Sequence, residues 1–284
     1  MTRRTVLVVE TDKHGGGKLS LMNPETVLFD EDKNGNPIDT HPKLTQSQQY
    51  LWQLRMTGIQ KTLELADGCE IMVIDLGDET QGVKHPAALV TTRESDQLTI
   101  ADYNMWPWFS CPNVKYIRQV VGTEAHNFGQ GSSELALART WKERYPGLDI
   151  KPFYHGLLTY NGIDIDCAHH GPGVGSRNWL AGNVARFYLR DLMQRDIMEG
   201  HKPPDLVFRG HYHNKCHEVL ETGNYRSELY VVPSFTMLGD HANQVMQSPS
   251  TITNGFMAVA IEDGKITDTE CYYETQDVRT REEL

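Results

Sequence analysis

The chain has 284 residues, of which 39% are hydrophobic and 23% charged, a composition typical of a globular protein and not of a disordered one. Its 38 acidic residues outnumber its 27 basic residues, and the net charge of -11 has the wrong sign for a protein that grips nucleic acid through phosphate contacts alone. The five cysteines are scattered without a C-x-x-C pair, so the sequence indicates neither a disulfide framework nor a cysteine zinc site. No apolar run approaches the roughly 20 residues of a membrane span. We therefore expect a cytoplasmic protein without a membrane segment or a signal peptide.

The first half of the chain alternates predicted strands with predicted helices. Residues 5–9 are apolar on both faces, as in a strand buried within an α/β sheet. Residues 20–43 carry turn-forming clusters such as Asn34-Gly35-Asn36-Pro37, which predict a long loop insertion. The following strands are expected at residues 70–74 and 114–121, and the helices at residues 45–66, 93–109 and 132–145.

The second half of the chain is richer in predicted strands. They are expected at residues 150–158, 163–168, 205–208, 229–233, 255–261 and 266–273, with one long helix at residues 178–198. No internal repeat, linker or low-complexity segment interrupts this pattern. We therefore expect a single domain over residues 1–284.

Five polar clusters follow predicted strands, where an α/β sheet places its ligand-binding crevice. In chain order they are Asp12-x-His14, Gly77-Asp78, Gly122-Thr123-Glu124-Ala125-His126, His169-His170 and Gly210-His211-x-His213. Two side chains that are two residues apart on an extended segment project to the same side, so Asp12 and His14 are expected to bind one ion together, and His211 and His213 repeat that spacing.

The residue types in these clusters indicate a metal centre. Imidazole and carboxylate groups are ligands of Zn, Mn, Fe, Co and Ni, and a group of four to eight would hold two ions that share a bridging carboxylate. We expect that bridge to be Asp78. Two ions about 3.5–4 Å apart can clamp a phosphoryl group and deprotonate the water that attacks it.

The order of the five clusters resembles the signature of the calcineurin-like metallophosphoesterases, which is Asp-x-His, Gly-Asp, Gly-Asn-His, His and Gly-His-x-His. The resemblance implies an α/β fold, a two-layered β-sandwich flanked by helices, with a binuclear metal centre at the strand ends. It also implies that one ion is held by Asp12, His14, Asp78 and His213. The second ion would be held by Asp78, His211 and either His169 or His170, of which we favour His169.

The third cluster departs from the family pattern. The position of the family's Asn ligand falls on Thr123, and the position of its histidine falls on Glu124. The nearest imidazole in the sequence is His126. We expect His126 to take the catalytic role of stabilising the transition state or protonating the leaving group, and Thr123 or Glu124 to complete the shell of the second ion.

The function implied by this resemblance is hydrolysis of phosphate esters by a metal-activated hydroxide, with phosphodiesters of the nucleotide or nucleic-acid type expected as substrates. The long segment after Asp-x-His and the Gly-Thr-x-x-His form also resemble predicted metallophosphoesterases of bacteriophages and prophages. We expect two divalent ions, with manganese first and Fe, Zn, Ni or Co as alternatives, and no required protein partner. The alternative is a catalytically impaired relative that acts as a binding module.

Overall fold

The computed structural model describes residues 4–128, 132–173, 182–239 and 250–282. Its larger sheet has six strands in the order β13 (Lys265–Asp277), β12 (Thr251–Glu262), β1 (Arg4–Glu10), β4 (Glu70–Asp75), β5 (Val114–Val120) and β6 (Asp149–Phe153). The second sheet has five strands in the order β10 (Cys216–Thr222), β11 (Tyr225–Val231), β9 (Leu206–Arg209), β8 (Ile163–Ala168) and β7 (His155–Tyr160). Parallel pairing joins β1, β4, β5 and β6 in the first sheet, and β8, β9 and β11 in the second.

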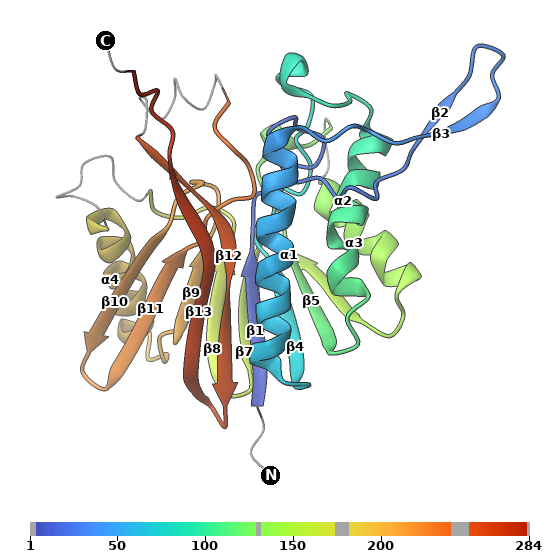
Figure 1. The fold of residues 1–284 in the computed structure, drawn as a ribbon. Coiled ribbons are helices and arrows are strands. Elements are labelled where there is room, and N and C mark those ends of the chain that lie inside the picture. Colours follow the sequence, from blue (N-terminus) through green and yellow to red (C-terminus); the bar gives the residue numbers. More distant parts are fainter. Residues whose placement is uncertain (1–3, 129–131, 174–181, 240–249, 283–284) are drawn as a thin grey trace.

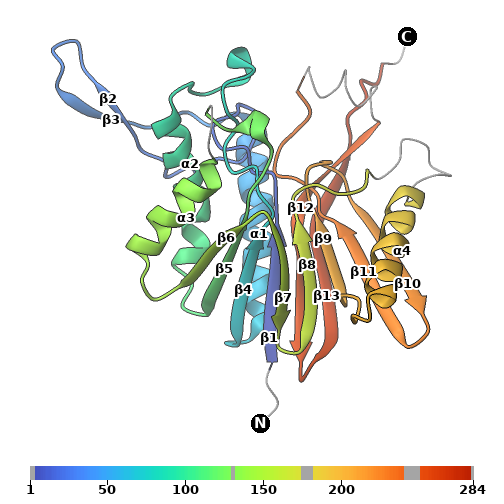
Figure 2. The ribbon, with the colours of Figure 1, turned by 180° about the vertical axis from the view of Figure 1, so that it is seen from behind.

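The two sheets pack face to face and are flanked by helices (Figures 1 and 2). Helices α1 (Gln46–Ala66), α2 (Glu94–Phe109) and α3 (Ser133–Arg144) cover the outer face of the six-stranded sheet, and α4 (Asn183–Met198) covers the outer face of the other. A buried apolar layer that includes Leu7, Ile74, Ile165 and Phe208 fills the space between the sheets. The predicted α/β class, a two-layered sandwich flanked by helices, is confirmed.

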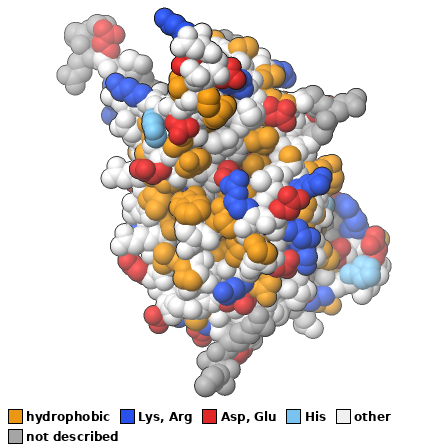
Figure 3. All heavy atoms as spheres, turned by 90° about the vertical axis from the view of Figure 1, so that its right-hand side faces the viewer, with side chains coloured by type: hydrophobic (Ala, Val, Ile, Leu, Met, Phe, Trp, Pro, Cys, Tyr) orange, Lys and Arg blue, Asp and Glu red, His pale blue; other side chains and the backbone are white. Residues whose placement is uncertain are grey.

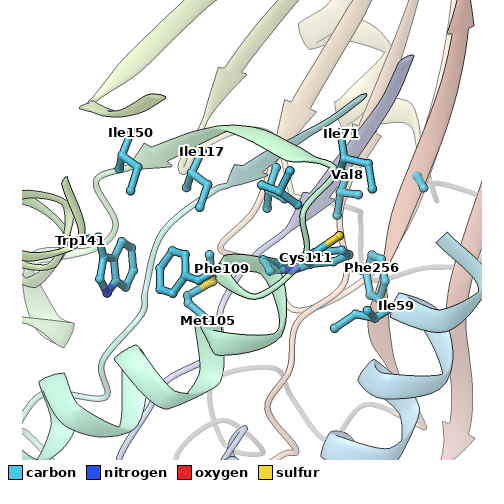
Figure 4. Packing of buried hydrophobic residues seen from close by; sticks show 14 of the residues in the cluster. Val8, Ile59, Ile71, Met105, Phe109, Cys111, Ile117, Trp141, Ile150 and Phe256 are labelled. Carbon is cyan, nitrogen blue, oxygen red and sulfur yellow. The ribbon is translucent and has the colours of Figure 1, made fainter. Parts of the chain in front are cut away.

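A second apolar layer lies between the six-stranded sheet and its helices (Figure 4). Trp141 of α3 and Phe109 of α2 meet edge to face, with 5.1 Å between ring centroids, and Phe256 of β12 packs below α1. In the aromatic segment at the end of α2, Trp108 is fully buried, whereas Trp106 is 53% exposed. On the face shown in Figure 3, hydrophobic side chains lie in small groups between charged side chains of both signs.

Helix α1 begins and ends where its sequence indicates. The side chain of Thr45 accepts a hydrogen bond from the backbone N–H of Gln48, and the side-chain oxygen of Gln48 accepts one from the backbone N–H of Thr45. Asp67 closes the helix in a left-handed conformation. Within the described residues, no helix is long and apolar enough to cross a membrane.

Three expectations about local structure need correction. The predicted loop at residues 20–43 contains a two-stranded hairpin, β2 (Leu28–Glu31) and β3 (Pro37–Thr40), which projects from the body of the molecule (Figure 1). The single strand expected at residues 150–158 is two strands, β6 and β7, which belong to different sheets. Strand β10 was not predicted. The predicted helix at residues 178–198 starts outside the described residues, and α4 is described from Asn183 onward.

These elements bring the predicted clusters to one end of the sandwich. Strands β1, β4 and β5 are parallel neighbours, so the segments that follow them leave the sheet at the same edge. Strands β8 and β9 of the second sheet are also parallel to each other. The backbone of Gly210, after β9, donates to the carbonyl of His169, after β8, at 3.0 Å.

Candidate metal centre

The side chains that follow β1, β4, β5, β8 and β9 converge on one cluster. Four overlapping groups of three residues each place their nitrogen or oxygen ligand atoms within 4.8 Å of one another. The groups are Asp12, His14 and His213; His14, Asp78 and His126; Asp12, Asp78 and His169; and His169, His170 and His211. The structure therefore brings together residues from all five predicted clusters.

Most of these residues have an unusual backbone conformation. The φ angles are +52° at Asp12, +48° at His14, +57° at Asp78, +70° at His211 and +50° at His213. Left-handed conformations are uncommon outside glycine and cost on the order of 1–3 kcal/mol each, so they persist where the surrounding structure fixes them. The reason given above for pairing Asp12 with His14 is thus wrong: these residues leave the strand through left-handed turns and not as an extended segment.

Glycines in three of the clusters let the chain segments approach closely. A Cβ atom on Gly122 would lie 2.1 Å from Asp78 Oδ1, and one on Gly210 would lie 2.3 Å from Thr11 Oγ1. Gly77 has a φ of +103° and faces Gly122 across the same contact. The glycines before Asp78, Thr123 and His211 are therefore sterically required at this site.

Asp12 uses its two carboxylate oxygens differently. Oδ2 accepts hydrogen bonds from the hydroxyl of Thr11 at 2.6 Å and from the backbone N–H of His211 at 3.0 Å. Oδ1 lies 3.1 Å from His213 Nε2 and 3.5 Å from His14 Nε2. Oδ2 is thus held by hydrogen bonds within the protein, and Oδ1 faces the imidazoles of His14 and His213.

The two imidazoles beside Asp12 face each other through their ring nitrogens. His14 Nε2 and His213 Nε2 are 3.1 Å apart, and two lone pairs at that distance repel unless a proton or a cation lies between them. His14 is buried, so water does not relieve this contact. The donor set fits a divalent cation, for which neutral imidazole and carboxylate are ordinary ligands.

Asp78 lies at the centre of the cluster and also has one held and one free oxygen. Its Oδ1 accepts the backbone N–H of Thr123 at 2.5 Å. Its buried Oδ2 has no hydrogen-bond partner among the described residues, although His169 Nε2 lies 3.1 Å away and His126 Nε2 lies 3.8 Å away. An ionised oxygen buried without a partner is costly, and a cation would remove that cost.

His169 is oriented by a contact behind its ring. Its Nδ1 lies 2.7 Å from the carbonyl oxygen of Leu76, which can only accept a hydrogen bond, so Nδ1 carries the proton and Nε2 faces the cluster. The hydroxyl of Thr123 lies 3.0 Å from His169 Nε2 and 3.2 Å from His211 Nδ1. His169 is buried, whereas its neighbour His170 is exposed.

The environment keeps both carboxyl groups ionised. Burial on its own would raise the pKa of Asp12, but the charge of His213 and the hydrogen bond with His14 hold it well below its usual range. Burial also opposes ionisation of Asp78, yet the imidazole of His169, 3.1 Å from Oδ2, lowers its pKa to about 2. Both residues therefore present the charged form that binds cations.

The imidazoles are divided between neutral and charged forms. Burial and the neighbouring His126 lower the pKa of His14 to about 4, and burial together with His169 lowers that of His211 to about 4. Burial works against the charged form of His169 as well, but Asp78 raises its pKa to about 9. Binding of a metal ion by His169 would therefore displace a proton.

The remaining predicted residues of the third cluster are separated by the structure. Residues Glu124–His126 form a short 3-10 helix, and Glu124 is exposed and belongs to none of the four groups found among the described residues. His126 turns back toward the cluster, where its ring centroid lies 4.3 Å from that of His14. Thr123 and Glu124 were the two candidates for the shell of the second ion. Among the described residues, only the side chain of Thr123 contacts His169 and His211.

A buried charge network behind the ligands was missed from the sequence. The ammonium group of Lys13 contacts Asp75, Glu79 and Glu10, and Arg55 of α1 pairs with Glu10. All of these side chains are fully buried. The signal that was available is the presence of Glu10 and Asp75 at the ends of strands that are apolar on both faces.

No family model and no curated protein matches the chain. Among solved structures, it is similar to a predicted phosphoesterase of Streptococcus pneumoniae, at 10% identity over 98% of this chain and 99% of that one, with a TM-score of 0.36. An NAD nucleotidase of Haemophilus influenzae has 10% identity over 94% of this chain and 50% of that one, with a TM-score of 0.38. A sulfate thiohydrolase of Thermus thermophilus has 11% identity over 96% of this chain and 56% of that one, with a TM-score of 0.36. The chain thus spans about half the length of the last two, and similarities at this level carry no conclusion about activity.

Proposed function

We propose that this chain is a metal-dependent hydrolase of phosphate esters, built as a single domain that holds two divalent cations. The observation that carries the proposal is the crowding of potential metal-ligand atoms around one point of the structure. Asp78 Oδ2 has no hydrogen-bond partner among the described residues, and the Nε2 atoms of His14 and His213 face each other at 3.1 Å. A cation would satisfy all three atoms.

The proposed ligands fall into two sets that share Asp78. The first set is Asp12, His14, His213 and Asp78, and the second is Asp78, His169, His211 and Thr123. His169 is preferred to His170 because it is buried and lies 3.1 Å from Asp78 Oδ2. Thr123 is preferred to Glu124 because its hydroxyl contacts both histidines of the second set.

In this proposal, the bound cations act as Lewis acids on the phosphoryl oxygens and lower the pKa of the attacking water. His126 supplies the proton for the leaving oxygen. Its Nδ1 lies 3.0 Å from the carbonyl oxygen of Gln81 and therefore carries a proton, while Nε2 faces the cluster 3.8 Å from Asp78 Oδ2. Nε2 is therefore the ring atom through which His126 would exchange a proton with the reacting group.

Phosphodiesters of nucleotides or nucleic acids are the proposed substrates, and manganese is the first ion to test. The substrate class rests on the resemblance of the sequence motifs to calcineurin-like metallophosphoesterases, including the Gly-Thr-x-x-His form, which resembles predicted bacteriophage enzymes. The net charge of -11 favours small diesters over a long nucleic acid bound through its phosphates. The hydroxyl of Thr123, a weaker ligand than the amide it replaces, favours a second candidate, a metal-poor binding module.

The test is metal content by mass spectrometry combined with hydrolysis of bis-p-nitrophenyl phosphate and p-nitrophenyl phosphate after manganese loading. Asp78→Asn should remove most of the bound metal and activity together. Asp164→Asn is the matched control, because Asp164 pairs with Lys202 on the surface at 2.9 Å. Two ions per chain with turnover of the diester would support the enzyme. One ion or none, without turnover of either ester, would favour the binding module, and full activity of Asp78→Asn would refute the site.

A further inference from the structure

The buried charge network lies directly behind the proposed ligands. Lys13 stands between Asp12 and His14 in the chain, but its fully buried side chain contacts carboxyl groups that are not among the proposed ligands. Its ammonium group contacts Asp75, lies 2.5 Å from Glu79 Oε1 and lies 3.3 Å from Glu10 Oε1. One cation is thus shared by three buried carboxyl groups.

These three carboxyl groups belong to the segments that carry the ligands. Glu10 ends β1 just before Asp12, Asp75 ends β4, and Glu79 follows Asp78. The backbones of the two segments also pair: Asp12 donates to Gly77 at 2.9 Å and His14 donates to Asp78 at 2.9 Å. Lys13 therefore joins the two turns through carboxyl groups that lie outside the proposed ligand set.

We propose that Lys13 is a positioning residue that holds the turn of Asp12 and His14 in register with the turn of Asp78. This inference rests on the proposed metal site. Five ligands of that site have left-handed backbones, which persist only where the surroundings fix them, and three of the five, Asp12, His14 and Asp78, lie on these two turns. Arg55 cannot replace Lys13, because its guanidinium is engaged by Glu10 at 2.9 and 3.0 Å and by the carbonyl of Asn104 at 2.7 Å.

The charges explain why the turns depend on this lysine. The ammonium group links Glu10, in the segment of Asp12, to Asp75 and Glu79, in the segment of Asp78, and without it these buried carboxyl groups lose the one donor that they share. The segment of Glu79 carries Asp78, and the segment of Glu10 carries Asp12. Ligand oxygens that must meet a common ion would then lose their alignment, although none of them has been altered.

The experiment is calorimetric titration of the metal-free protein with Mn²⁺. The electron paramagnetic resonance spectrum of Mn²⁺ in the loaded protein is the second measurement. Lys13→Met keeps the length of the side chain and removes its charge. Because this variant leaves unbalanced buried carboxylates and can fail to fold, Lys13→Met/Asp75→Asn is made as well, since it removes one charge of each sign. Lys202→Met is the matched control, because Lys202 also lies between two aspartates, at 2.9 Å from Asp164 and 2.7 Å from Asp205.

We expect Mn²⁺ affinity about 10- to 100-fold lower in the folded Lys13 variants, as for other residues that orient metal ligands, together with an altered resonance spectrum. The Lys202 variant should keep the wild-type affinity and spectrum. A folded double variant that binds Mn²⁺ as the wild type does would overturn the role of Lys13. Absence of Mn²⁺ binding by the wild-type protein would instead overturn the proposed function, so the two failures are distinguishable.

Discussion

Gly122→Ala should damage the metal centre although it replaces no ligand. A Cβ atom at this position would lie 2.1 Å from Asp78 Oδ1 and 2.3 Å from the backbone nitrogen of Asp78. The carboxylate could rotate away, but the nitrogen belongs to a turn that is paired with the segment of His14. Ordinary van der Waals contact begins near 3.4 Å, so the turn of Asp78 must move by 3.4 − 2.3 = 1.1 Å.

A displacement of this size predicts measurable losses. Overpacking of a buried site costs about 1–3 kcal/mol of the free energy of unfolding. Misplacement of a catalytic group by about 1 Å lowers turnover on the order of 100-fold. The assays are urea unfolding of the metal-free protein and hydrolysis of bis-p-nitrophenyl phosphate after manganese loading.

Gly147→Ala is the matched control for this substitution. Among the described residues, no atom lies within 4 Å of a Cβ built on Gly147, and its φ is not in the left-handed region. The control should leave turnover unchanged and leave stability equal to or slightly above that of the wild type, because alanine restricts the unfolded chain. Wild-type stability and turnover in Gly122→Ala would refute the close packing of the two turns.

Three further outcomes test other parts of the site. His126→Gln should lower turnover about 10²- to 10⁴-fold while two ions stay bound, as expected for a proton donor; loss of one ion in metal analysis would make His126 a ligand instead. Thr123→Val should weaken binding of the second ion in a calorimetric titration, and Thr123→Asn, which supplies an amide oxygen, should not; equal affinities for both variants would exclude the side chain from the shell. Chelation should lower the free energy of unfolding by about 2.7 kcal/mol from its value at a free metal concentration 100 times the dissociation constant, and an unchanged melting curve would argue against metal binding by the folded state.

The sequence predicted the strands that carry the site because their side chains are apolar on both faces. Residues 5–9 and 70–74 were expected, and β1 and β4 occupy Arg4–Glu10 and Glu70–Asp75. Neighbouring parallel strands release their following segments at one edge, so polar clusters after such strands meet in space. This rule needs only the order of the elements, and it located every cluster at the candidate site.

Local backbone geometry could not be predicted in the same way. The left-handed conformations at Asp12 and His213 are fixed by contacts with chain segments about 200 residues away, such as the 3.1 Å contact between their side chains. The division of residues 150–158 into β6 and β7 depends on which sheet each half joins. The burial of Lys13 depends on carboxyl groups from β1 and β4. Periodicity within one segment contains none of this information.

The structure also explains how the third cluster can differ from the family pattern and still serve the site. The bond from Thr123 to Asp78 Oδ1 comes from the backbone N–H, so it does not depend on the side chain at this position. What it requires is Gly122, which allows Asp78 to approach. The side chain at position 123 therefore affects only the contacts with His169 and His211.

The imidazole of His126 is positioned by a separate set of hydrogen bonds. The backbone N–H of His126 donates to the carbonyl of Thr123 at 3.0 Å, which closes a helical turn and returns the ring toward the site. Thr80 and Gln81, in the segment that follows Asp78, then hold the residue: the hydroxyl of Thr80 donates to its carbonyl at 2.8 Å, and the carbonyl of Gln81 accepts from its ring. An imidazole two residues later in the chain than in the pattern that the sequence resembles is therefore held beside Asp78 by the segment that follows Asp78.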